Sequence, residues 1–256
     1  VSVRLLAGDD TSDTFGHGRS DFLSNPREVL LAETYELEHG PLRHRLRQIG
    51  HIGQSELQLV VDTFPDFDFC EVEIAGAWQE QEKILKLEIG TLLGQPESCF
   101  EMPFEMVRRP TNGEEVPGHR WCSLAGNTVR GTRMTITLVN DGCCSFAARG
   151  SALESMLRRS VEATRYGETG HEVRHGIPYL DQGAFRYRFR IYLREGAGMP
   201  AQAGLDCEDF SVPAQVQAVT QHPGTLPAQA SMLQMDASST RMVAMKPAEA
   251  GGGIVL

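Results

Sequence analysis

The sequence predicts an all-β protein, and three observations support that fold class. The chain of 256 residues contains 26 glycines and 13 prolines, which favours many turns. Few windows repeat apolar residues at helical spacing, whereas several alternate apolar and polar residues. A hydrophobic content of 41% is enough for one large core or two smaller ones and excludes a disordered chain.

Three segments show the two-residue period of a half-buried strand. They are residues Leu57 to Val61, Met134 to Leu138 and Phe185 to Leu193. In the last segment, apolar residues occupy one face and Arg186, Arg188 and Arg190 the other. Those arginines fit either a ligand-binding ladder or the solvated outer face of an antiparallel sheet, and the solvated face is the favoured interpretation.

Other segments complete the expected organisation. The spacing of apolar residues from Leu153 to Thr164 by itself predicts a helix, and the Ala, Gln and Pro-rich stretch from Gly196 to Pro227 predicts a long connection. A small strand set is expected from Met232 through Lys246, with a further strand in the closing GGGIVL. We therefore expect a large β-sandwich over residues 1–215 and a linker with an incomplete β segment over residues 216–256. Val1 falls in what reads as mid-strand, so we expect an excised piece of a longer protein.

Charge and cysteine content narrow the class of protein. A net charge of −10 argues against nucleic acid, because phosphate binding needs clustered Lys and Arg. The six cysteines are irregularly spaced and predict no disulfide framework, which favours a reducing cytosol. No apolar run is long enough for a membrane span and no signal peptide begins the chain, so a cytoplasmic protein without a membrane partner is expected.

Isolated chemical motifs give little support for catalysis within this chain. Residues His171 to His175 match HExxH, the zinc peptidase pattern, but that chemistry needs a helix, and glycine and proline flank the motif. The favoured interpretation is a polar loop. Cys143 and Cys144 have no second pair to complete a metal site and are expected to be packed thiols. No nucleophile elbow is present, so no catalytic residue and no metal ligand is assigned.

Several segments, in order and spacing, resemble glycoside hydrolase family 38, the α-mannosidases. They are DTSDTFGHG at Asp10 to Gly18, EHGPLR at Glu38 to Arg43, WQEQEKILKL at Trp78 to Leu87, EMPFEMVRRPT at Glu101 to Thr111, PGHRWCSL at Pro117 to Leu124, TLVND at Thr137 to Asp141, DQG at Asp181 to Gly183 and AMKPAE at Ala244 to Glu249. The first of these has Phe15 where the family has tryptophan, and Glu82 stands in place of a family histidine.

The resemblance implies the C-terminal half of such an enzyme. The expected fold is a large antiparallel β-sandwich, a galactose-mutarotase-like supersandwich, plus the start of a smaller β domain. It also implies a strand, not a helix, in the segment that begins at Leu153. The family's zinc and catalytic aspartates lie in an N-terminal domain that nothing here resembles. The isolated chain is thus expected to be inactive, with no cofactor of its own, and to need that domain as a partner.

Carried over residue by residue, the resemblance implies that the sandwich lines the sugar site. Phe15, His17, Arg158 and Arg159 are the substrate-binding candidates, for a mannose-containing carbohydrate. Aromatic faces suit the apolar face of a pyranose, and guanidinium groups suit paired hydroxyls. The alternative is a free-standing carbohydrate-binding or mutarotase-like domain, and self-association into a homo-oligomer is left open.

Overall fold

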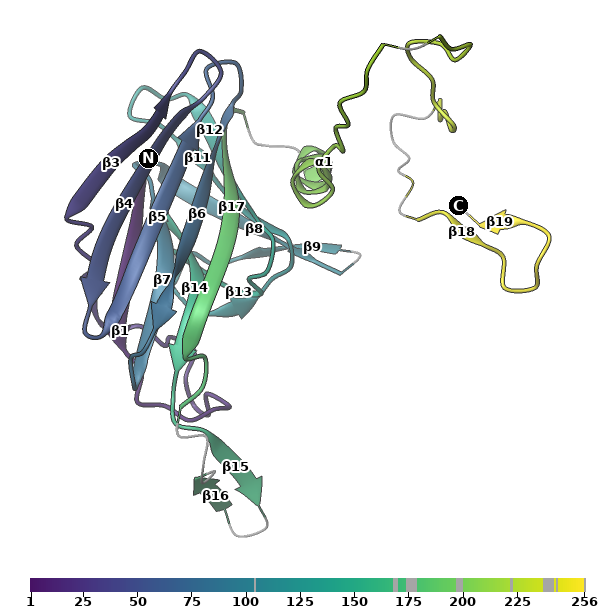
Figure 1. The fold of residues 1–256 in the computed structure, drawn as a ribbon. Helices are drawn as coiled ribbons and strands as arrows, with labels where there is room; N and C mark the ends of the chain where they lie inside the picture. Colours follow the sequence, from purple (N-terminus) through teal and green to yellow (C-terminus); the bar gives the residue numbers. More distant parts are fainter. Residues whose placement is uncertain are drawn as a thin grey trace. The chain divides into compact units, whose positions relative to one another are not determined.

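The computed structural model contains two large antiparallel β-sheets (Figure 1). It describes residues 1–103, 105–167, 170–173, 179–196, 200–221, 223–236, 242 and 244–255. Residues Val1 to Ala214 form one compact unit and residues Gln215 to Leu256 another. No helix in these ranges is long and apolar enough to cross a membrane.

The larger sheet has nine strands, each hydrogen-bonded to its neighbours in antiparallel register. In spatial order they are β3 (Glu33–His39), β4 (His44–Ile52), β5 (Ser55–Thr63), β6 (Phe69–Trp78), β17 (Gly183–Glu195), β12 (Arg133–Asn140), β11 (Trp121–Asn127), β8 (Gly94–Met102) and β9 (Glu105–Arg109). The predicted strands at Leu57, Met134 and Phe185 are β5, β12 and β17, so those predictions are confirmed.

The smaller sheet has six strands, also antiparallel. In spatial order they are β10 (Val116–Pro117), β13 (Ser145–Arg149), β14 (Ala152–Ser160), β7 (Lys83–Gly90), β1 (Ser2–Asp9) and β2 (Ser24–Glu28). A separate hairpin of β15 (Thr164–Gly167) and β16 (Gly170–Val173) follows β14.

One hydrophobic core fills the space between the two sheets. Its members alternate along each strand with residues that face outward, for example Leu85, Leu87 and Ile89 of β7 and Phe185, Phe189 and Ile191 of β17. Because both inner faces contribute, the unit is a β-sandwich. The predicted all-β fold class and large antiparallel sandwich are confirmed.

The helix that the spacing of apolar residues from Leu153 predicts is wrong, since Ala152–Ser160 is strand β14. The register of β14 against β7 shifts between Met156 and Arg158, which marks a β-bulge. Buried Leu153 and Leu157 are four residues apart, and residues at that spacing share one face in a strand as well as in a helix, so the apolar pattern fits both structures. The strand implied by the family resemblance is the correct assignment there.

The expected long connection after Gly196 was wrong over part of its length, because Pro200–Ser211 forms helix α1. Proline is favoured at the first position of a helix. Ala203, Cys207 and Phe210 lie on one side of α1 and pack with Trp121, Val139 and Tyr192 on the outer face of the larger sheet. Its three buried apolar side chains are too few to stand out in the sequence.

The C-terminal unit contains a single described hairpin, β18 (Lys246–Pro247) with β19 (Ile254–Val255). Gly251 and Gly252 adopt positive φ in its turn, which glycine tolerates without strain. The strand predicted in the closing GGGIVL is β19. The described residues from Ser231 to Asp236 carry no strand, so the strand set expected from Met232 begins later than predicted.

The arginine face of β17 is paired throughout. Arg186, Arg188 and Arg190 make ion pairs of 2.6 to 2.7 Å with Glu73, Asp141 and Glu71. Tyr192, on the same face, is buried beneath α1. Carboxylates therefore occupy the guanidinium groups, as expected for the outer face of a sheet and not for an open ligand ladder.

Candidate functional site

The loop of residues 10–23 connects β1 to β2 and carries two of the predicted site residues. Asp10 and Asp13 organise its first half by accepting backbone hydrogen bonds. Asp10 Oδ1 accepts from the Ser12 amide at 3.0 Å, and Asp13 Oδ1 accepts from the amides of Phe15 and His17 at 3.0 and 3.2 Å. Such aspartate turns fix a loop that has no sheet partner.

Arg159 of β14 anchors the first half of that loop to the smaller sheet. Its Nε donates to Asp10 Oδ2 at 2.6 Å, and its terminal nitrogens donate to Ser12 Oγ at 2.5 Å, Asp13 O at 2.7 Å and Thr14 O at 3.2 Å. The guanidinium also lies 4.4 Å from the centroid of the Phe22 ring. These bonds use four of its five N–H donors. Arg159 therefore positions the loop and has little donor capacity left for a ligand.

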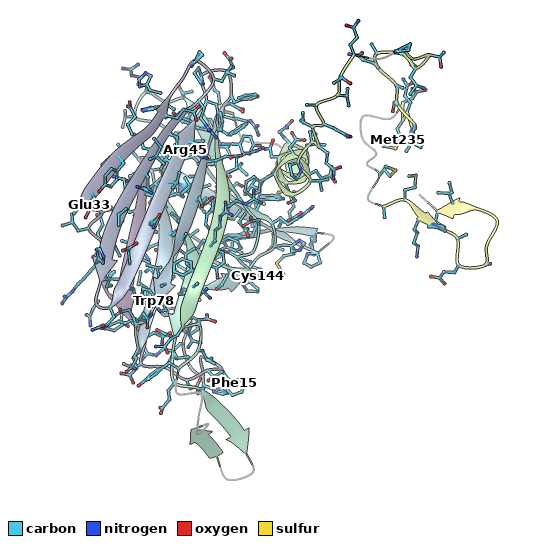
Figure 2. The ribbon with its side chains drawn as sticks, viewed as in Figure 1. Phe15, Glu33, Arg45, Trp78, Cys144 and Met235 are labelled. Carbon is cyan, nitrogen blue, oxygen red and sulfur yellow. The ribbon has the colours of Figure 1, made fainter. Side chains whose placement is uncertain are left out.

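Phe15 and His17 extend from the anchored loop. Phe15 is 56% exposed, and its ring centroid lies 5.5 Å from that of His17. The His17 Nδ1 atom lies 2.7 Å from Asp13 Oδ2. The hydrogen bond from His17 lowers the pKa of the Asp13 carboxyl to about 2, against a weaker opposing effect of burial. Asp13 thus stays ionised and holds the imidazole beside the ring of Phe15. Phe15 itself lies at one end of the sandwich (Figure 2).

Arg158 lies on the opposite side of the smaller sheet from Arg159. Adjacent residues of a strand point to opposite faces. Arg158 donates to Ala184 O at 3.1 Å, and its guanidinium lies 4.8 Å from the ring centroid of Phe185. The structure therefore brings Phe15, His17 and Arg159 together in one loop region and separates Arg158 from them.

A buried ionic cluster, which sequence reasoning did not single out, lies on the outer face of the smaller sheet. The Lys86 ammonium is fully buried and contacts the carboxylates of Glu115 and Glu154, the latter at 2.9 Å. Burial by itself lowers the pKa of Lys86, but the charges and hydrogen bonds of the two carboxylates outweigh it, so the pKa is raised. The only hint in the sequence is a lysine within the apolar KILKLEIG strand.

This cluster is connected to the loop of residues 10–23. Arg149 donates to Glu154 Oε1 and to Asp21 Oδ2, both at 2.8 Å. The amide of Glu115 donates to Ser20 O at 2.6 Å. Both ends of the loop are therefore fixed, the first by Arg159 and the second by Arg149 and Glu115.

The HExxH match does not have the helix that zinc peptidase chemistry requires. Its first three residues, His171 to Val173, belong to strand β16, which pairs with β15. Arg174 and His175 lie outside the described residues. The described part of the motif therefore lies in a strand and not in the helix that the pattern requires.

The cysteine pair divides into two environments. Cys143 is buried in the core, where burial raises the pKa of its thiol to about 12. Cys144 is exposed, so the expectation of two packed thiols was right for one residue and wrong for the other. None of the six cysteines forms a disulfide, as the sequence predicted.

The described residues up to Ala214 thus form a large antiparallel β-sandwich, and the loop of residues 10–23 is anchored to its smaller sheet. The sequence profile of the glycosyl hydrolases family 38 C-terminal domain matches residues 17–165, more than half of the chain. The chain belongs to this family.

Solved structures share the fold. An alpha-mannosidase from Enterococcus faecalis V583 superposes with a TM-score of 0.69 at 11% identity, over 88% of this chain and 29% of the other. A glycosyl hydrolase family 38 protein from Enterococcus faecalis gives a TM-score of 0.67 at 12% identity, over 88% of this chain and 30% of the other. This chain spans less than a third of either protein. No curated protein sequence matches it.

Proposed function

We propose that this chain is the substrate-lining and structural β-sandwich portion of an α-mannosidase-like glycoside hydrolase. Its partners would be a mannose-containing carbohydrate and an N-terminal catalytic domain that brings the zinc ion and the catalytic carboxylates. Family membership supports the first part, and the structural neighbour that is an alpha-mannosidase suggests the substrate. The six cysteines without disulfides support a reducing, cytoplasmic location.

The observation that carries the proposal is the anchored loop. Arg159 and Asp13 fix the backbone from Asp10 to His17, and the loop presents an aromatic ring that is mostly exposed. An aromatic ring that is 56% exposed and lies next to an imidazole suits contact with the apolar face and the hydroxyls of a sugar.

The loop itself has no carboxylate available for catalysis. The Asp10 side chain is 2% exposed and paired with Arg159, and Asp13 is hydrogen-bonded to His17. Asp21, the remaining one, is paired with Arg149. A glycosidase needs two carboxyl groups that flank the scissile bond. We therefore assign both of them, and the zinc, to the N-terminal domain.

In this proposal the loop residues have different roles. Phe15 and His17 contact the sugar, since they extend from the loop towards solvent. Arg159 is a positioning residue, because its donors are directed at the loop backbone and at Asp10.

The test measures hydrolysis of a chromogenic α-mannoside with added Zn²⁺. We expect no turnover by this chain alone and turnover after it is combined with the N-terminal portion of its parent protein. In the combined enzyme, Phe15→Ala should lower kcat/KM by about tenfold, a loss of ~1.4 kcal/mol that corresponds to one aromatic contact.

Replacement of Phe67, a ring that is also mostly exposed but lies between β5 and β6, is the matched control and should leave kcat/KM unchanged. Turnover by the chain alone would refute the proposal. Tight binding of mannose by the chain alone would instead favour the free-standing carbohydrate-binding domain.

A further inference from the structure

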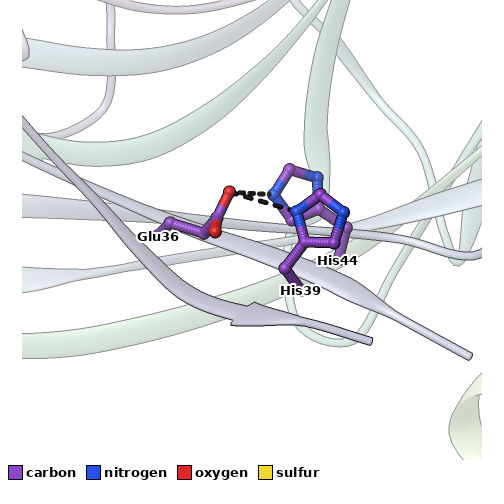
Figure 3. A group of neighbouring side chains, drawn as sticks. All are labelled: Glu36, His39 and His44. Carbon is purple, nitrogen blue, oxygen red and sulfur yellow. Dashed lines mark hydrogen bonds and ion pairs between the residues drawn. The ribbon is translucent and has the colours of Figure 1, made fainter. Parts of the chain in front are cut away.

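The hairpin of β3 and β4 carries a cluster of three potential metal ligands, unrelated to the loop of residues 10–23. Glu36 Oε2 lies 3.3 Å from His39 Nδ1 and 3.0 Å from His44 Nε2 (Figure 3). The ligand atoms of all three residues lie within 4.8 Å of one another. Glu36 and His39 are exposed and His44 is half-buried, so an ion could enter from solvent.

A β-bulge places these side chains on one face. Residues 36 and 39 are three apart, and in a regular strand they would point to opposite faces. The register of β3 against β4 shifts between Glu36 and Glu38, which adds one residue at Leu37 and restores a common face. His44 lies directly opposite His39 across the hairpin. The three side chains thus converge because of a specific irregularity in an edge strand.

The spacing of the ligand atoms suits a tetrahedral zinc ion. Zinc bonds of about 2.0 to 2.1 Å to His nitrogen and carboxylate oxygen place two ligands about 3.3 to 3.4 Å apart. Two of the three separations, at 3.3 and 3.0 Å, are already close to that range. The third, between the two histidine nitrogens, is at most 4.8 Å, and a bound ion would shorten it by turning the rings. A neutral imidazole can move its proton to the other nitrogen, which frees the facing nitrogen as a ligand.

We propose that Glu36, His39 and His44 form a surface site for a divalent transition metal, with Zn²⁺ as the best match to two imidazoles and one carboxylate. Three protein ligands leave the fourth position for water. Because His39 and His44 come from the two strands of one hairpin, the ion links the edge strand β3 to β4. Such a site would correct the expectation, drawn from the sequence, that this chain has no metal ligand.

This site lies away from the proposed sugar loop. Arg45, which follows His44, is at one end of the sandwich and Phe15 at the other (Figure 2). The cluster therefore does not take part in the proposed function, and its test is independent of mannoside hydrolysis.

The experiment titrates the metal-stripped 256-residue chain with Zn²⁺ by calorimetry and records its thermal unfolding with and without Zn²⁺. Wild type should bind one ion at this site and gain in Tm, since a ligand bound only to the folded state stabilises it. His39→Asn and His44→Asn should each weaken binding by at least about tenfold, because even changes to residues behind the ligands cost about 10 to 100-fold.

His51→Asn is the matched control, since His51 is an exposed histidine of β4 whose ring lies 3.6 Å from Glu56. It should bind Zn²⁺ as wild type does, and so should His171→Asn in the HExxH match. Co²⁺ bound in place of Zn²⁺ should give an absorption spectrum without thiolate charge-transfer bands, which would exclude the cysteines as metal ligands. Failure of wild type to bind Zn²⁺, or unchanged binding in His39→Asn and His44→Asn, would overturn the proposal.

Discussion

Arg159→Ala should destabilise the protein strongly, whereas the neighbouring Arg158→Ala should not. Arg159 is 13% exposed and its partner Asp10 is 2% exposed, so the pair lies in a largely desolvated site. Removal of the guanidinium leaves the Asp10 carboxylate without a charged partner and releases the bonds to Ser12, Asp13 and Thr14. The loss exceeds that of an ordinary surface ion pair.

The size of the stability loss follows from the Asp10 carboxylate, which stays buried after Arg159 is removed. Breaking a buried ion pair by removing one partner costs about 3 to 5 kcal/mol. Asp10 keeps its hydrogen bond from the Ser12 amide, which moderates the cost, so we expect a loss of about 3 kcal/mol. For a domain of this size that corresponds to a fall in Tm of roughly 6 to 12 °C. Arg158→Ala removes a cation–π contact with Phe185 and one bond to a carbonyl, worth about 1 kcal/mol.

Urea denaturation of wild type and both variants measures these differences, together with the m-value as a check on cooperativity. Arg159→Lys keeps the charge but not the planar fork, and it should recover less than half of the loss. The reasoning is wrong if Arg159→Ala falls within about 1 kcal/mol of wild type, or if the two alanine variants are equally stable.

Three further predictions follow from the same geometry. Lys86→Met should cost about 3 to 5 kcal/mol in urea denaturation, because it leaves the Glu115 carboxylate buried without its cation and Glu154 with Arg149 alone, while Lys83→Met at the surface should cost less than about 1 kcal/mol. The amide resonances of Phe15 and His17 should shift as pH falls from about 3.8 towards about 2, because the Asp13 carboxylate is protonated there and its stabilising hydrogen bonds, present above that range, are lost. In His17→Ala the midpoint of the Phe15 shift should rise towards 3.8. An unchanged midpoint would contradict His17 as the cause of the lowered pKa. Phe210→Ala should release α1 from the larger sheet at a cost of about 3 kcal/mol, measured as lost amide protection in α1, whereas the exposed Val212→Ala should leave that protection intact.

Regular strands could be predicted from the sequence, and irregular ones could not. Residues Phe185 to Ile191 alternate because one face of β17 meets the core and the other carries arginines in ion pairs, so the residue types show the period of the strand. β14 has the same kind of environment, but its bulge shifts the alternation by one residue. The alternation of apolar and polar residues identifies a strand only while its register is constant, so a bulge is not recognised from that alternation.

Helix α1 was missed for a different reason. Its stability comes from three residues that pack on Trp121, Val139 and Tyr192, which are far away in the sequence. Alanine, cysteine and phenylalanine at these positions give only a weak apolar stripe by themselves. Tertiary packing, not intrinsic propensity, makes most short helices stable.

The candidate site could likewise be predicted only in part from the sequence. The resemblance pointed to the Asp10 to Gly18 segment and to an arginine pair, but it could not decide between Arg158 and Arg159. The bulge in β14 determines which of them faces the loop. The bulge in β3 likewise brings Glu36 to His39 and His44, a cluster that no motif indicated.

The sequence by itself determined the all-β class, the main strands, the absence of disulfides and the family, because composition, alternation and ordered motifs are local properties of the chain. The tertiary structure decided which face each arginine occupies, where the one described α-helix packs, and which charged groups share a buried site. Those outcomes depend on register and on contacts between distant segments, and a single bulge reverses the direction of every side chain beyond it.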